Sequence, residues 1–71
     1  MTSEYRYRVD GYEDIDHVDR GSLTSRGSDT LREARIYAKQ YLREPEFACL
    51  IGYVQITRLS DLDIVVEDLF A

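Results

Sequence analysis

The sequence predicts an α+β fold, a two-layer sandwich in which one α-helix packs on a three- to four-stranded, antiparallel-rich sheet in the order β(β)αββ. Three observations predict it. Residues 5–9 alternate between apolar or aromatic and basic side chains, the period of a half-buried strand. Residues 28–45 carry apolar side chains at helical spacing, and residues 47–69 form two β-rich runs around a polar turn. With 71 residues, we expect one domain spanning residues 1–71.

The stretch EYRYRVDGY contains the first predicted strand. Strict alternation places Tyr5, Tyr7 and Val9 on one face, beneath the helix, and Arg6 and Arg8 on the other. A stacking platform for single-stranded nucleic acid needs aromatic and basic groups on the same exposed face. The alternation therefore argues against direct nucleic-acid binding.

The segment YEDIDHVDRGSLTSRG, residues 12–27, allows two interpretations. It is either a functional loop or it contains a short edge strand over residues 18–25, with Asp14 and Asp16 in the turn before it. We favour the strand, because structureless loops of this length are uncommon in compact domains.

The helix is predicted within SDTLREARIYAKQYLREP. Thr30 and Glu33 have the spacing of a capping box, and Pro45 would end the helix. At about 100° per residue, one side of the helix carries the apolar residues and should face the sheet. This predicted core face consists of Leu31, Ala34, Tyr37, Ala38, Tyr41 and Leu42.

The last third predicts a β-hairpin. Residues 47–59 form its first strand, residues 62–69 form its second, and Ser60 begins the turn. Gly52 is expected to leave space for the approach of the helix. We expect Phe70, beside the end of the sequence, either to pack under the helix or to contact another chain.

The composition limits the classes of function that this chain could have. The net charge is −5 and the pI is about 4.6, which opposes phosphate binding as the default activity. A single cysteine, Cys49, excludes a disulfide within one chain and suits a reducing compartment, and its apolar neighbours predict that it is buried. The sequence starts without an apolar run and contains no stretch of the roughly 18 apolar residues that a membrane span needs. We expect a soluble, cytoplasmic protein without a membrane partner.

His17 is the only histidine and lies within EDIDHVD. The spacing does not match a calcium loop, and the chain offers too few nitrogen and sulfur ligands for zinc. Ser22, Ser25 and Ser28 are close to His17 in sequence, but in a polar segment from which nothing excludes water. So small a chain also leaves little volume for a substrate pocket. We therefore predict no catalytic residues, no metal and no cofactor.

Two surfaces remain as candidates for binding another protein. One is the acidic segment, residues 10–19. The other is the outer side of the helix, where Ile36 points outward and where the basic ridge consists of Arg32, Arg35, Lys39 and Arg43. For the ridge we favour a solvated face with charges matched to the helix dipole. The alternative is a surface that meets an acidic partner. The candidate partner-binding residues are Asp14, Asp16, Asp19, Arg32, Arg35, Ile36 and Lys39.

The arrangement of YRYRV as a strand, SDTLREARIYAKQYL as a helix and CLIGYVQI with DIVVED as a hairpin resembles small proteins carried by phages and other mobile elements, including anti-CRISPR inhibitors. This resemblance implies a stand-alone cytoplasmic protein that binds and blocks a larger host complex, which could itself bind nucleic acid. Two alternatives are a nucleic-acid-binding dimer that uses Arg6, Arg8 and Arg58 on the sheet face opposite the helix, and a regulatory, antitoxin-like homodimer.

Overall fold

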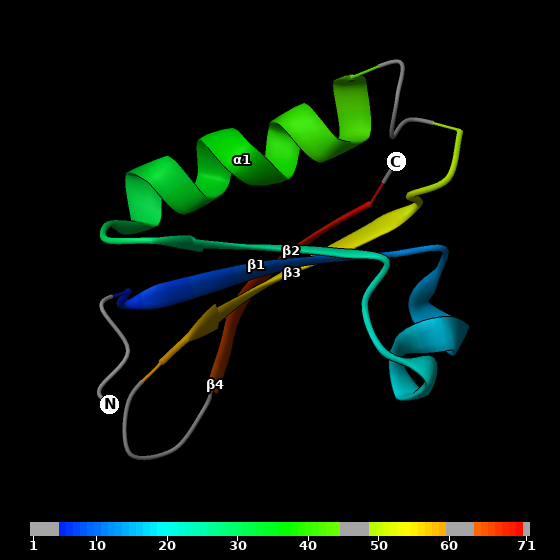
Figure 1. Cartoon of the computed structure of the whole chain (residues 1–71), viewed down its shortest axis with the longest axis horizontal. Helices are drawn as coiled ribbons and strands as arrows, with labels where there is room; N and C mark the ends of the chain where they lie inside the picture. The colour runs from blue at the N-terminus through cyan, green and yellow to red at the C-terminus, as the bar shows by residue number, and fades with distance from the viewer. Residues whose placement is uncertain (1–4, 45–48, 60–63, 71) are drawn as a thin grey trace.

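The computed structural model describes residues 5–44, 49–59 and 64–70. One α-helix covers one face of a four-stranded antiparallel sheet, which confirms the predicted α+β sandwich (Figure 1). The strand order β2-β1-β3-β4 places β1 and β3 in the middle and β2 and β4 at the edges. The elements are β1 (Tyr7–Tyr12), the 3-10 helix η1 (Ile15–Arg20), β2 (Thr24–Ser28), α1 (Leu31–Arg43), β3 (Tyr53–Arg58) and β4 (Ile64–Phe70).

After β1 the chain forms a 3-10 helix before it forms an edge strand, β2. The Asp14 side chain accepts a hydrogen bond from the backbone N–H of Asp16 and so caps η1. Gly21, with a positive φ of 89°, ends η1, and β2 begins only at Thr24. The predicted strand over residues 18–25 is therefore placed too early, because local capping holds its first part in the 3-10 helix.

The helix follows its sequence signals closely. The Thr30 hydroxyl accepts a hydrogen bond from the backbone N–H of Glu33 at 3.1 Å, which confirms Thr30 as the N-cap. The predicted core face is also confirmed, whereas Pro45 lies outside the described residues. Of that face, Ala34, Ala38 and Tyr41 are buried, and Leu31, Tyr37 and Leu42 are half-buried against the core.

The core lies between α1 and the central strands. Val9 of β1 and Ile56 of β3 are direct register partners and are both fully buried. Ala34 and Ala38 of α1 belong to the same cluster, and their small side chains let the helix lie close to the sheet. Full burial of one aliphatic side chain contributes about 1.5–3 kcal/mol, so this pair is a major source of stability.

Gly52 is needed for a different contact from the one predicted. Its backbone N–H lies 3.0 Å from the carbonyl oxygens of both Tyr12 and Glu13, and a Cβ there would lie 2.6 Å from the Glu13 oxygen. The close neighbour is thus the chain leading into η1, not α1. The predicted burial of Cys49 is also wrong, because residues 49–50 form an exposed turn and β3 begins only at Tyr53.

The N-terminal alternation holds for Tyr7 and Val9, which pack towards α1, but not for Tyr5. Tyr5 precedes β1 and is 51% exposed. Its ring occupies the place where a side chain of Gly27 would stand, and Gly27 is the register partner of Arg8. The ring therefore lies on the side of the sheet opposite α1, because the strand period does not constrain a residue outside the strand.

Candidate protein-binding surfaces

The acidic segment is organised around His17. Its Nδ1 lies 2.5 Å from Oδ1 of Asp14, and its Nε2 lies 3.7 Å from a carboxylate oxygen of Glu13. The hydrogen bond with the His17 ring holds the pKa of the Asp14 carboxyl below its usual value. Asp16 and Asp19 are exposed, whereas Asp14 is half-buried. Two of the three predicted acidic residues therefore face solvent, and the third mainly stabilises the start of η1.

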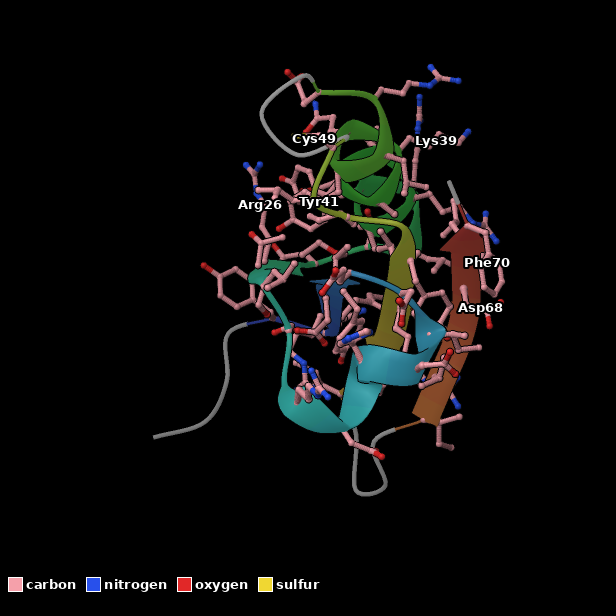
Figure 2. The ribbon with its side chains drawn as sticks, turned by 90° about the vertical axis from the view of Figure 1, so that its right-hand side faces the viewer. Arg26, Lys39, Tyr41, Cys49, Asp68 and Phe70 are labelled. Atoms are coloured by element: carbon pink, nitrogen blue, oxygen red, sulfur yellow. The ribbon has the colours of Figure 1, made fainter. Side chains whose placement is uncertain are left out.

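The predicted helix surface is exposed as expected, and Ile36 retains 46% of its accessible surface. One of its charges is already used within the chain. Arg35 Nε lies 2.8 Å from a Glu67 carboxylate oxygen and so joins α1 to β4. Arg32 and Lys39 are exposed on the same helix, and Lys39 projects on the side of α1 that overlooks β4 (Figure 2).

The structure does not bring the two predicted surfaces together. Figure 1 shows α1 on one side of the sheet and η1 on the other. A single flat partner surface therefore cannot contact both the acidic segment and the helix ridge. We define the sheet face on the side away from α1 as the open face.

Arg8 and Arg58, two of the three arginines proposed for nucleic-acid binding, do not share the open face either. Arg8 lies there, but its Nε is 2.7 Å from the buried Asp10 carboxylate. Arg58 is the register partner of Tyr7, which packs towards α1, so Arg58 lies on the helix side. The placement of Arg58 on the face opposite the helix is therefore wrong. Arg58 follows Ile56 by two residues and Val54 by four, and this spacing in the sequence indicates that all three lie on the same face of the strand.

The surface that sequence reasoning missed is the outer strand β4. Four of its seven residues are exposed apolar side chains, and together they define the β4 surface. In the part of the chain that the structure describes, no strand or helix lies beyond β4 (Figure 2). The residues of the β4 surface are Ile64, Val65, Val66 and Phe70, which retain 44%, 47%, 38% and 59% of their accessible surface.

Phe70 continues from the β4 surface onto the open face. It pairs with Tyr53, and their ring centroids are 4.9 Å apart. The Tyr53 hydroxyl accepts a hydrogen bond from the Gln55 side chain at 3.1 Å and donates one to Asp68 at 3.3 Å. Phe70 therefore does not pack under α1, which removes the first of its two predicted positions.

Tyr12 completes this cluster from β1, with its ring centroid 6.0 Å from that of Tyr53. Burial, together with the nearby Asp10 carboxylate, raises the pKa of the Tyr12 hydroxyl. Tyr12 and Tyr53 are both almost fully buried, whereas Phe70 is largely exposed. The cluster therefore anchors one end of β4 firmly and leaves one aromatic ring exposed at its outer edge.

Within residues 5–44, 49–59 and 64–70, no three histidine, cysteine or acidic side chains are placed to hold a metal ion. Over the same ranges, no helix is both long and apolar enough to cross a bilayer. No family model, curated protein or solved structure matches this chain.

Proposed function

We propose that this chain is a non-enzymatic protein-binding module that binds its partner along β4. The observation that carries the proposal is the seven-residue edge strand with exposed apolar side chains along its length. An exposed edge strand offers unpaired backbone N–H and C=O groups to another chain, and its side chains supply specificity. Edge strands without a partner are usually short, charged, interrupted by proline or covered by another segment.

A narrower form of the proposal is a phage-type inhibitor that blocks a larger host complex. Its support is the small single-helix α+β architecture, which resembles such inhibitors, together with the acidic charge. Carboxylates speed encounter with a basic surface and exclude wrong partners. The exposed Asp16 and Asp19 lie on the η1 side of the sheet and would serve this role at the rim of the contact.

The test is affinity capture from lysate of the cells that carry the gene, with two matched variants. Val65→Lys places a charge on the β4 surface, and Ile36→Lys places the same charge on α1 at almost the same starting exposure, 47% against 46%. We expect Val65→Lys to abolish capture of a stoichiometric partner and Ile36→Lys to retain it. The reverse result would assign binding to the helix surface and remove β4 from the proposal.

A second candidate is a regulatory homodimer in which β4 pairs with β4 of another copy. The apolar composition of β4 favours it, because homodimer interfaces are more apolar than transient ones. Mass measurement in solution across a range of protein concentrations tests it, and a concentration-independent monomer mass would exclude it.

A further inference from the structure

The register of β4 indicates what kind of strand would fit beside it. Thr57, Gln55 and Tyr53 alternate along β3 and pair with Val65, Asp68 and Phe70. A bulge between Ile56 and Thr57 accounts for the extra residue between Val65 and Asp68. On the open face, β4 therefore presents a fixed order of side chains: apolar, acidic, apolar.

The two acidic residues of β4 are in different electrostatic situations. Glu67 forms its ion pair with Arg35, so its charge is balanced within the chain. Asp68 is exposed, and its carboxylate accepts a hydrogen bond from the uncharged Tyr53 hydroxyl. η1, with further carboxylates, follows Tyr12 at the end of the sheet where Phe70 also lies. The open-face side of β4 therefore attracts a cation.

A second copy fits this pattern poorly. In an antiparallel pair of β4 strands, the register that places Phe70 opposite Val66 of the other copy also places Asp68 opposite Asp68. The register that places Phe70 opposite Val65 instead places Asp68 opposite Glu67. Like charges directly opposite one another destabilise a strand pair. Each copy also carries a net charge of −5, which adds repulsion at longer range.

We propose that the partner of β4 is an extended segment of another protein whose side chains on one face read apolar, basic, apolar. This inference rests on the proposed function and specifies its partner. The basic residue lies opposite Asp68, one apolar residue packs on Phe70 and Tyr53, and the other packs on Val65. Backbone hydrogen bonds to the outer side of β4 hold the segment as a fifth strand.

The test uses two seven-residue peptides, TVTKTVT and TVTETVT, which differ only in the central charge. Each is added at millimolar concentration to isotope-labelled protein, and amide chemical shifts locate and quantify binding. We expect the lysine peptide to shift the amides of β4 and to bind about three- to tenfold more tightly than the glutamate peptide, the range expected for exchanging an attractive for a repulsive cross-strand pair. The difference should shrink at about 1 M salt, where the Debye length is about 3 Å.

Asp68→Lys should reverse the preference, so that the glutamate peptide binds more tightly. Asp29→Lys makes the same charge change beside β2, at the other edge of the sheet, and should leave the preference as it is. Circular dichroism should show that both variants remain folded. Equal binding of the two peptides at β4 would overturn the inference about charge and leave the proposed function in place.

Three other outcomes would also overturn the inference, and they differ in what they mean for the proposed function. If the protein alone forms a dimer as its concentration rises, and the amide chemical shifts that change belong to β4, the partner of β4 is a second copy of this chain and the inference is overturned. If neither peptide shifts β4 amides while Val65→Lys still abolishes partner capture, the chemistry assigned to the partner is wrong and the surface is right. If Val65→Lys also leaves capture intact, the proposed function fails together with the inference.

Discussion

The two edges of the sheet differ in ways that match opposite roles. β2 has five residues, TSRGS, with no large apolar side chain, and the Tyr5 ring lies over Gly27. β4 has seven residues, of which Glu67 and Asp68 alone are charged. A short polar edge with a glycine covered by a ring discourages pairing with another chain, whereas a long apolar edge invites it. The contrast within one sheet shows that exposure of β4 is not a general property of the fold.

Both edges are nevertheless tied to α1 by an arginine. The Arg26 guanidinium of β2 lies 3.8 Å from the ring centroid of Tyr37 on α1. Arg35 of α1 reaches in the other direction and pairs with Glu67 of β4. The edges therefore share a mode of attachment to the helix and differ in what they present to other molecules.

The largest expected loss of stability comes from truncating an isoleucine at the centre of the sheet, compared with the same change on β4. Ile56→Ala removes a fully buried side chain and should lower the free energy of unfolding by about 2–5 kcal/mol. Ile64→Ala makes the same change on β4, where the side chain is 44% exposed, and should cost less than about 0.5 kcal/mol. Urea denaturation measures both, and Ile56→Val provides a milder variant if Ile56→Ala does not fold. Similar costs at the two positions would mean that β4 belongs to the core.

The next largest loss of stability is expected on removing either of the two arginine contacts that join the edge strands to α1. Arg26→Ala should lower the free energy of unfolding by about 0.5–1 kcal/mol, the usual worth of an exposed cation–π contact. Arg35→Ala should cost about 0.2–1 kcal/mol, because both side chains of its ion pair are partly solvated. Double-mutant cycles with Tyr37→Leu and Glu67→Gln isolate the two pairs. The Arg35–Glu67 coupling should fall at high salt, and a coupling insensitive to salt would contradict an electrostatic attachment.

Part of this fold could be predicted from the sequence alone. The helix was predictable in detail, because Thr30 and the spacing of Ala34, Ala38 and Tyr41 report on local hydrogen bonds and on one buried side. β1 was predictable from Tyr7 onwards for the same reason. The turns between apolar runs predicted a largely antiparallel sheet, but they left open whether it has three or four strands.

The candidate surface was less predictable. An apolar run such as IVV has the same sequence whether its own chain covers it or a partner does, so the exposure of Val65 and Val66 required the strand order. Cys49 was misplaced because a run of apolar residues can form a turn as well as a strand. The position of Tyr5 depended on Gly27, far away in sequence, which periodicity cannot detect.

A smaller effect tests whether β4 is apolar for binding and not for folding. Val65→Thr keeps the branched shape and β-propensity while removing apolar surface, so the free energy of unfolding should change by less than about 0.5 kcal/mol. The same variant should weaken binding of the TVTKTVT peptide. Ser25→Val is the mirror change on β2 and should create no peptide binding there. A Val65→Thr variant that unfolds readily would assign these side chains to folding.

The smallest effect concerns the segment that joins β1 to β2. The pKa of Asp14 is lower in the folded chain than in the unfolded chain, because the His17 contact favours the carboxylate. Its contribution to stability is therefore fully present above the ordinary aspartate pKa of about 3.9 and is lost as the pH falls through the lower folded-state value.

Thermal unfolding of wild type and Asp14→Asn across that range measures this contribution. The wild type should be the more stable protein at pH 6, and the two melting temperatures should converge as the solution is acidified. Asp19→Asn, on the same segment, controls for the lost charge. Melting temperatures that remain equally far apart at every pH would show that Asp14 acts only through its neutral hydrogen-bonding capacity.

The strand order also has a consequence for how the chain folds. β1–β2 and β3–β4 are local hairpins, but the junction between them, β1 with β3, joins segments on either side of the helix, such as Val9 and Ile56. Loop-closure entropy must be overcome before such distant contacts stabilise the chain, so this junction should limit the folding rate. During synthesis β1 and α1 emerge before β3, so their apolar sides stay uncovered until β3 has been made. At this stage the nascent chain exposes apolar surface to chaperones and is prone to aggregation.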